Sequence, residues 1–254
     1  MKKKLHSLVT IIIMLTFTVN TYAQNTTCVK DSTKRTRIVR KETPNNYTCY
    51  IEMTRGGSKI YGTGFLIHPR VILTAGHNLA YYPTGRVKNV KMYFGSIDSL
   101  NYEIEQEVKL KRGKNKFYKS NYFMFDNIKR DFSIIILSDS SVYKKIKGHF
   151  NIEPITTLST DSITITGSPG DKEKFEIWTE STSNFFISEN ALKYDLYTKV
   201  RNSGSPVWYQ KKTNTYNIAG VHSRSYGSCS ASVFITPEVY NQIKKWCDKA
   251  GINL

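Results

Sequence analysis

Short runs of β-branched and aromatic residues, separated by turn-forming residues, recur along most of this 254-residue chain. No amphipathic helix alternates with them, so the pattern favours an antiparallel sandwich or barrel over a parallel α/β sheet. The expected strands cover residues 48–53, 60–67, 71–74, 87–94, 133–137, 162–167, 194–198, 206–209, 218–223 and 232–235. The sequence therefore predicts an all-β fold, long enough for one large domain or two smaller ones.

One helix is predicted near the C-terminal end. Thr236 is a suitable N-cap, and Pro237 then occupies the first helical position. Apolar residues recur at three- and four-residue spacing from Val239 to Trp246, before Gly251 ends the pattern. The expected class is thus all-β with a C-terminal helix.

The first 23 residues have the pattern of a targeting segment. Lys2 begins a run of three lysines, an apolar stretch covers residues 8–17, and Thr21-Tyr22-Ala23 fits a cleavage site. Residues 1–23 are therefore expected to be a secretory signal peptide. A membrane anchor is the alternative, but the apolar run is shorter than the roughly 20 residues of a transmembrane helix. We expect a secreted protein, extracellular or periplasmic, with no stable membrane insertion.

Export permits disulfides, and the chain has four cysteines, which allow three pairings. Proximity in the sequence favours Cys28 with Cys49 and Cys229 with Cys247. The cysteine and histidine spacings match no zinc site, so no structural metal is expected.

The net charge of the whole chain is +17, and three of the lysines that contribute to it lie in the predicted signal peptide. Basic residues are spread along the chain instead of gathering on one helix, and no nucleic-acid motif is present. We therefore expect no nucleic-acid partner. Such a charge favours solubility and could steer acidic polypeptides to the surface. The sequence carries no signal for oligomerisation, and a monomer is the default expectation.

Ser203 lies in the segment Asn202-Ser203-Gly204-Ser205-Pro206-Val207, at the entrance to an expected strand. A glycine after a nucleophilic serine leaves room for a substrate carbonyl, and N–H groups at a tight turn can stabilise an oxyanion. On its own, the segment fits an ordinary polar turn equally well.

His77 ends the segment Leu73-Thr74-Ala75-Gly76-His77, and Asp131 directly precedes the apolar run 132–137. Imidazole titrates near neutral pH and can take the proton of a serine hydroxyl, while a carboxylate can orient the ring. Each residue alone is commonly structural. Their order along the chain, His77 then Asp131 then Ser203, each on its own strand or turn, indicates a catalytic triad.

Thr-Ala-Gly-His, Asp-Phe-Ser-Ile-Ile and Asn-Ser-Gly-Ser-Pro-Val together resemble the three active-site motifs of trypsin-like serine proteases. The resemblance implies two antiparallel β-barrels of the chymotrypsin-like type over residues 38–254, with the active site in the cleft between them. It also implies an acyl-enzyme mechanism in which Ser203 attacks, His77 transfers the proton and Asp131 orients His77. It implies no cofactor and no metal.

The second half of the chain resembles, more narrowly, the secreted bacterial glutamyl endopeptidases, through residues 163–172, 193–196, 219–223 and 232–235. This resemblance implies protein or peptide substrates with Glu, or Asp, before the scissile bond. Thr198 and His222 would form the S1 pocket, and Ser223 would begin a stretch whose backbone pairs with the substrate. A carboxylate needs hydrogen-bond donors and positive charge, which a histidine and a hydroxyl can supply. If His222 faces the core instead, the protease would prefer a residue other than Glu before the scissile bond.

Arg201 departs from the family pattern, which usually has glycine two residues before the nucleophile. The N–H groups of Arg201 and Ser203 would form the oxyanion hole, and Arg201 would place a basic side chain near the cleft. Arginine resists backbone conformations that glycine accepts, and losing one donor lowers turnover by on the order of 10²–10³. One alternative is therefore a catalytically impaired, protease-fold binding protein. Another is a basic module that binds polyanions, with a steep salt dependence.

Residues 24–37 are polar and basic, and are expected to be a short propeptide or a tail of the mature protein. Thr36-Arg37-Ile38-Val39 resembles the activation site of trypsin-like zymogens, where a cut after Arg37 would free the α-amine of Ile38. Alternatively, Ile38 and Val39 are only a hydrophobic pair in a basic tail.

Overall fold

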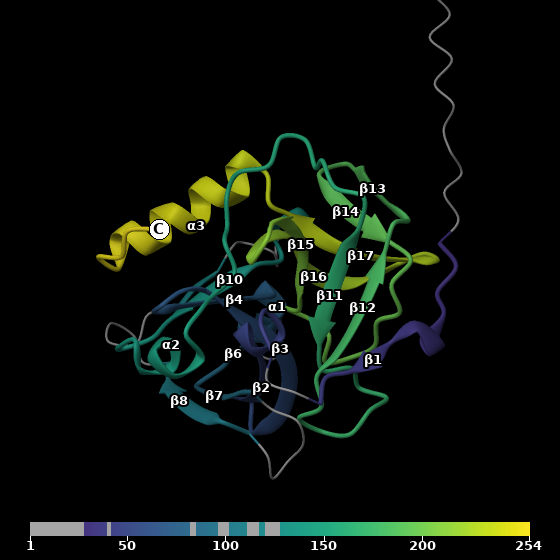
Figure 1. Ribbon diagram of the computed structural model, residues 1–254. Helices are drawn as coiled ribbons and strands as arrows, with labels where there is room; N and C mark the ends of the chain where they lie inside the picture. The colour runs from purple at the N-terminus through teal and green to yellow at the C-terminus, as the bar shows by residue number, and fades with distance from the viewer. Residues whose placement is uncertain (1–27, 40–41, 82–84, 96–101, 111–116, 120–127) are drawn as a thin grey trace, which may run out of the picture.

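The computed structural model describes residues 28–39, 42–81, 85–95, 102–110, 117–119 and 128–254 (Figure 1). The predicted signal peptide, residues 1–23, lies outside them. Within that part of the chain, none of the helices combines the length and the apolar character that crossing a bilayer requires.

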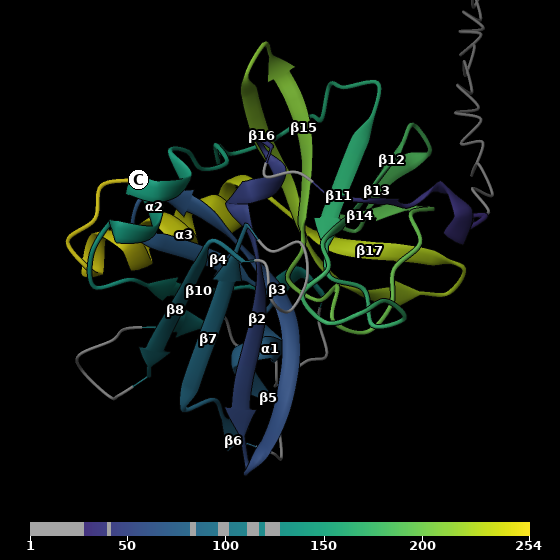
Figure 2. The ribbon, with the colours of Figure 1, turned by 60° about the horizontal axis from the view of Figure 1, so that its bottom comes forward.

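Two antiparallel sheets form the body of the described structure, and Figure 2 shows them as separate curved layers. The strands of the first are β2 (Thr48–Arg55), β3 (Ser58–His68), β4 (Val71–Thr74), β7 (Asn89–Phe94), β8 (Ile104–Lys109), β9 (Phe117–Lys119) and β10 (Ser133–Ile136). They pair in the order β8-β7-β2-β3-β4-β10-β9.

The second sheet uses the C-terminal half of the chain and one strand from the N-terminal end. Its strands are β1 (Thr36–Arg37), β11 (Ile163–Gly167), β12 (Trp178–Thr182), β13 (Phe185–Ser188), β14 (Ala191–Tyr194), β15 (Pro206–Lys212), β16 (Thr215–Tyr226) and β17 (Cys229–Phe234). They pair in the order β1-β12-β11-β15-β16-β17-β14-β13. The predicted two-barrel, chymotrypsin-like architecture is confirmed.

The remaining elements are short, apart from the last helix. They are η1 (Ser32–Lys34), η2 (Asn45–Tyr47), α1 (Gly76–Leu79), the β5–β6 pair (Ala80–Tyr81 and Gly85–Arg86), η4 (Ile128–Arg130), α2 (Ser141–Ile146) and α3 (Pro237–Lys249).

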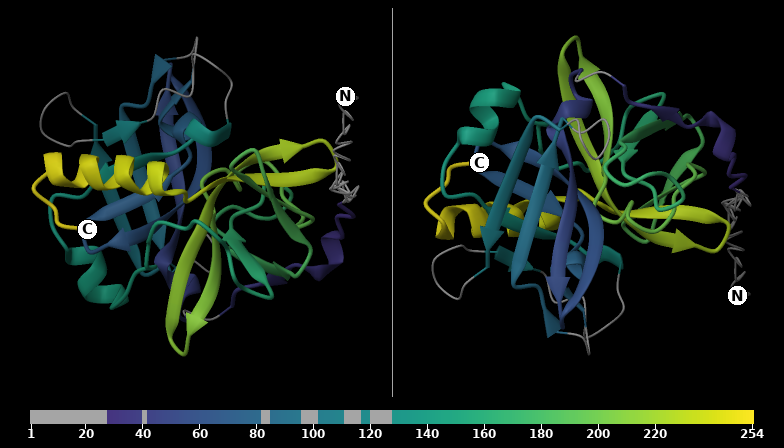
Figure 3. Two further views of the ribbon diagram at one scale, coloured as in Figure 1. Left: turned by 90° about the horizontal axis from the view of Figure 1, so that it is seen from above. Right: turned by 90° about the horizontal axis from the view of Figure 1, so that it is seen from below.

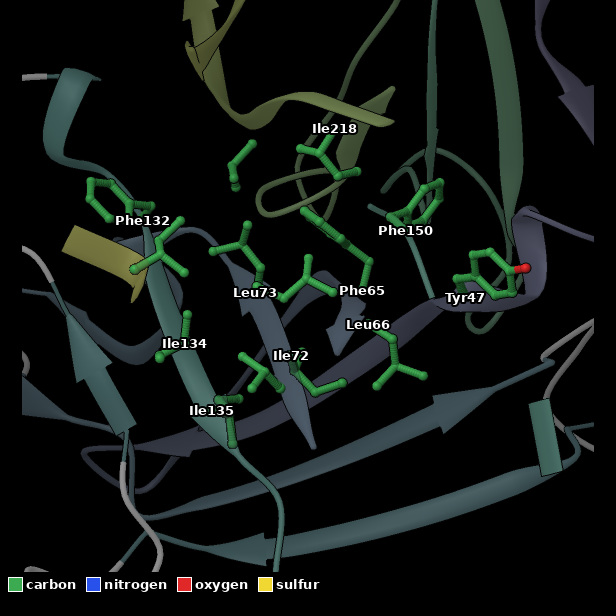
Figure 4. Packing of buried hydrophobic residues seen from close by; sticks show 14 of the residues in the cluster. Tyr47, Phe65, Leu66, Ile72, Leu73, Phe132, Ile134, Ile135, Phe150 and Ile218 are labelled. Atoms are coloured by element: carbon green, nitrogen blue, oxygen red, sulfur yellow. The ribbon is translucent and has the colours of Figure 1, made fainter. Parts of the chain in front are cut away.

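The two sheets share one continuous hydrophobic core (Figure 4). The neighbouring strands β4 and β10 of the first sheet are buried along their whole length. Phe150, from the connection between the sheets, packs edge-on against Phe65 of β3 at a centroid distance of 5.7 Å. It also lies 6.1 Å from the ring of Trp208 on β15 of the second sheet. Because each such buried side chain contributes about 1.5–3 kcal/mol, this seam holds the two sheets in a fixed relation.

Helix α3 begins and ends where the sequence predicts. The hydroxyl of Thr236 accepts a hydrogen bond from the N–H of Val239 at 3.3 Å, and Gly251, with φ +70°, follows the last turn. The helix leaves the second sheet and lies over the first (Figure 3). There the ring of Trp246 packs 5.3 Å from that of Phe132, next to Asp131.

Most of the predicted strands are present, but the one expected at residues 194–198 is wrong. Strand β14 ends at Tyr194, where the expected strand begins. The N–H of Tyr197 donates to the carboxylate of Glu180 at 2.9 Å, and the carbonyl of Leu196 accepts from the hydroxyl of Ser230 at 2.8 Å. Side chains, not a neighbouring strand, thus satisfy this backbone.

The disulfide pairing expected from sequence proximity is also wrong. Cys28 pairs with Cys229, across 201 residues. Cys49, on β2 in the first sheet, and Cys247, on α3, are free thiols buried in the core. The order of the strands brings the N-terminal segment to the second sheet, and this order cannot be read from cysteine spacing.

Thiol mapping tests this pairing. When the protein is denatured without reduction, we expect alkylation at Cys49 and Cys247 only, with Cys28 and Cys229 labelled after reduction, as read by peptide mass spectrometry. Cys229→Ser should lower the free energy of unfolding by about 2–5 kcal/mol in urea titrations, because the bridge closes a long loop. A peptide in which Cys28 is linked to Cys49 would contradict the structure.

Candidate active site

The pairing of β4 with β10 brings His77 and Asp131 together. Ser133 lies opposite Thr74, so the residues before β10 meet those after β4. The Nδ1 atom of His77 is 2.7 Å from Oδ2 of Asp131, and the backbone N–H of His77 donates to Oδ1 at 2.9 Å. The small Ala-Gly corner before the histidine is needed, because a Cβ at Gly76 would lie 3.2 Å from that same Oδ1.

Asp131 is completely buried and yet remains the charged partner of this pair. A third hydrogen bond to its carboxylate comes from the hydroxyl of Ser223 on β16. Burial on its own acts to raise the pKa of Asp131, but the charge of His77 and the hydrogen bonds from His77 and Ser223 outweigh it and hold that pKa below its ordinary value. The carboxylate is therefore ionised at neutral pH and can orient the imidazole.

Ser203 lies in a turn that is hydrogen-bonded to residues of β3 and α1. The carbonyl of Ser203 accepts hydrogen bonds from the N–H of Thr63 at 2.9 Å and from the side-chain amide of Asn78 at 2.8 Å. Gly204 follows with φ +87°, and a Cβ there would lie 2.1 Å from the carbonyl oxygen of Thr63. Only glycine fits this close approach, which explains the Ser-Gly pair of the motif.

A pocket of about 500 Å³ has both His77 and Ser203 in its lining. Thr198, His222 and Ser223, the expected substrate-binding residues, line the same pocket. The structure therefore places all of these residues around one cavity. The hydroxyl of Ser203 donates to the carbonyl of Ser223 at 3.4 Å.

His222 is buried at the inner end of this arrangement. Its Nδ1 lies 2.8 Å from the hydroxyl of Tyr194. Burial, with a smaller contribution from the charges of His77 and Lys30, lowers the pKa of His222 to about 3, against an opposing effect of Asp131. The ring is thus neutral near pH 7. When the Tyr194 hydroxyl donates to Nδ1, the proton of the neutral ring is on Nε2, available as a hydrogen-bond donor.

Arg201 adopts the backbone conformation that the sequence makes doubtful for an arginine. Its φ is +73°, in the left-handed region. The backbone carbonyl of Arg201 accepts from the hydroxyl of Thr63 at 2.9 Å. Within the described part of the chain, neither the N–H of Arg201 nor that of Ser203 donates a hydrogen bond, so both remain available to an oxyanion.

Arg201 is not among the residues that line the pocket. Its guanidinium donates to the carbonyl oxygens of Pro169 and Lys172 in the loop after β11. Phe175 of the same loop packs against the first sheet, where its ring centroid is 4.7 Å from those of Tyr50 and Tyr93. These contacts fasten the left-handed turn before Ser203 to both sheets.

Three contacts of the site were not predicted from the sequence: the hydroxyl of Ser223 on Asp131, that of Tyr194 on His222, and the amide of Asn78 on Ser203. The partners lie 92, 28 and 125 residues apart. No local spacing signals such contacts, because they depend on how the strands pair.

Comparison with known proteins identifies the family. The family model described as Trypsin matches residues 38–248. The chain belongs to the trypsin family of serine proteases. Among curated proteins, this trypsin-family chain is similar to the glutamyl endopeptidase of Staphylococcus aureus strain MW2, with 33% identity over 90 residues. The match covers 35% of the chain and 26% of that relative.

Solved structures agree with this assignment. A Glu endopeptidase in complex with MPD superposes with a TM-score of 0.70 at 26% identity, over 86% of this trypsin-family chain and 98% of the other. The protease Anisep from Arthrobacter nicotinovorans gives 0.64 at 16% identity, over 80% and 97% of the two chains, which supports the fold.

The buried, neutral His222 leads to a prediction about stability. Its folded pKa of about 3 lies below the ordinary histidine value of 6.5. Between these pH values the unfolded chain binds one more proton, so stability is fully present above pH 6.5 and falls as the pH falls. We expect a fall in pH from above 6.5 to about 3 to lower the unfolding free energy of the natural protein by about 4 kcal/mol more than that of His222→Gln. Urea titrations at a series of pH values measure this, and parallel curves would contradict it.

Proposed function

We propose that this chain is a secreted serine endopeptidase that cleaves peptide bonds after Glu, with Asp as the second choice. The observation that carries the proposal is the pairing of the buried Asp131 with His77, which lines the same pocket as Ser203 and His222. The matches to glutamyl endopeptidases support the same substrate class.

Each residue has a defined part in the proposed reaction. The Oγ of Ser203 attacks the scissile carbonyl while His77 takes its proton, and the N–H groups of Arg201 and Ser203 stabilise the oxyanion. The tetrahedral intermediate collapses to an acyl-enzyme as His77 gives the proton to the leaving amine. Water, deprotonated by His77, then releases the acid product. Asp131 holds the imidazole in place throughout.

The acidic preference rests on the inner part of the pocket. Thr198 and His222 offer a hydroxyl and an imidazole N–H to a carboxylate. The hydroxyl of Thr198 already forms a hydrogen bond with that of Ser230 at 2.7 Å, which fixes the orientation of the Thr198 hydroxyl. Ser223 and the residues after it on β16 would pair with an extended substrate backbone.

We also propose that residues 1–23 direct export and that residues 24–37 stay with the protein after any activating cut at Arg37. Cys28 is bridged to Cys229, and Arg35 forms an ion pair with Asp171 at 2.7 Å. Thr36 and Arg37 of β1 pair with Thr179 and Trp178 of β12. These contacts would keep the segment on the second sheet even with the chain cut.

The first test is a set of fluorogenic peptides that differ only in the residue before the scissile bond. We expect the Glu peptide to exceed the Gln peptide in kcat/KM by on the order of 10², because a site built for a carboxylate rejects a neutral amide. Ser203→Ala should lower kcat by on the order of 10⁶, and Ser162→Ala, an exposed serine outside the pocket, should change nothing. If neither the intact protein nor a form that begins at Ile38 cuts any peptide, the binding-protein alternative replaces this proposal.

Arg201 gives a second test. Arg201→Gly should keep most of the turnover, because glycine adopts a φ of +73° freely. Arg201→Met should lower kcat by up to about 10² with little change in KM, because the left-handed turn loses its hydrogen bonds to Pro169 and Lys172 and oxyanion stabilisation acts on the transition state. Thermal unfolding of both variants controls for loss of fold. Equal kcat in the two variants would show that the guanidinium does not position the oxyanion hole.

A further inference from the structure

The N-terminal segment lies against the second sheet, close to the candidate S1 pocket. The Cys28–Cys229 bridge ties it to the start of β17, and β1 pairs with β12 farther along the segment. Figure 3 shows this segment beside the tip of the β16–β17 hairpin. Residues 28–37 precede residues 38–248, the stretch that the trypsin model matches.

Lys30 is held next to the pocket by this bridge. Its Nζ lies 3.4 Å from the hydroxyl oxygen of Ser225, a pocket-lining residue on β16. The charge of Lys30 also reaches His222, where it lowers the pKa of the ring. The ammonium group is therefore near the place where a substrate carboxylate would enter.

A second cation faces the same space. Lys199 lines the pocket, and together with partial burial its charge lowers the pKa of Lys30. Across the described residues, neither lysine forms an ion pair with a carboxylate. Lys30 is partly buried and Lys199 is exposed. Their like charges repel each other, and an anion between them would relieve that repulsion.

We propose that Lys30 is a specificity residue that supplies the positive charge for the acidic side chain of the substrate. The inference rests on the proposed function and deepens it. The neutral His222 and the hydroxyl of Thr198 can donate hydrogen bonds to a carboxylate, but neither brings a full positive charge. A carboxylate that leaves water for a pocket needs a counter-charge. Lys30, tethered by Cys28–Cys229, provides it in the uncut chain.

The test compares three variants of the protein that begins at residue 24. Lys30→Met removes the charge, Lys30→Arg keeps it, and Lys34→Met removes an exposed lysine of the same segment as the matched control. For each, kcat/KM is measured on two peptides that differ only in Glu or Gln before the scissile bond. A merely structural role of Lys30 would affect both peptides alike, so the ratio isolates its charge.

We expect the Glu-to-Gln ratio to fall about tenfold in Lys30→Met, to stay within about threefold in Lys30→Arg, and to be unchanged in Lys34→Met. Added salt should lower the ratio in the natural protein more than in Lys30→Met. A ratio that Lys30→Met leaves unchanged, or a natural protein that does not prefer Glu, overturns the proposal.

Binding measurements separate this proposal from the proposed protease activity. If the natural protein cuts neither peptide, a product-like peptide that ends in Glu is titrated into it by calorimetry, with the same peptide ending in Gln as the reference. Tighter binding of the Glu peptide that Lys30→Met abolishes would support the role of Lys30 although the protease proposal fails. Absence of that difference would overturn both.

Discussion

The fully buried carboxylate of Asp131 is the constraint on which the site depends. A charge in the interior is tolerated only when it is paired and hydrogen-bonded. Its donors are the backbone and the ring of His77, after β4, and the hydroxyl of Ser223, on β16 in the other sheet. Satisfying one charge thus links both sheets at the cleft. The carbonyl of Ser223 also accepts a hydrogen bond from the hydroxyl of Ser203, so His77, Asp131 and Ser203 share one connected network.

The parts of the fold and site that could be predicted are those whose causes are local in the sequence. The cap at Thr236 and the proline after it are sufficient to predict where α3 begins. The motifs around His77, Asp131 and Ser203 are each short segments that can be recognised without knowledge of distant partners. The irregular stretch after Tyr194 and the Cys28–Cys229 bridge could not be predicted, because distant partners decide them. The side chains of Glu180 and Ser230 form hydrogen bonds with backbone groups that a neighbouring strand would otherwise pair with. The order of the strands brings Cys28 to the second sheet.

Arg201 shows how a residue type that is unfavourable locally can be accommodated. A left-handed arginine is strained, and strain of this kind persists only where surrounding contacts over-determine it. Here the guanidinium binds two carbonyl oxygens of the loop that Phe175 anchors among Tyr50 and Tyr93. Glycine would adopt the same turn without those contacts. The arginine therefore exchanges conformational freedom for a fixed link between the turn before Ser203 and the first sheet.

His222 and Lys30 illustrate why recognition of an acid would be divided between two groups. Burial makes the imidazole a well-oriented donor, and the same burial keeps it neutral. A protonated His222 would be an unpaired charge in the interior whenever the pocket is empty, which would destabilise the fold. An ammonium at the rim avoids this penalty, because Lys30 keeps contact with water and is brought there by a covalent bridge. Separating the hydrogen-bond donor from the charge lets the empty pocket remain stable and still favour an anion.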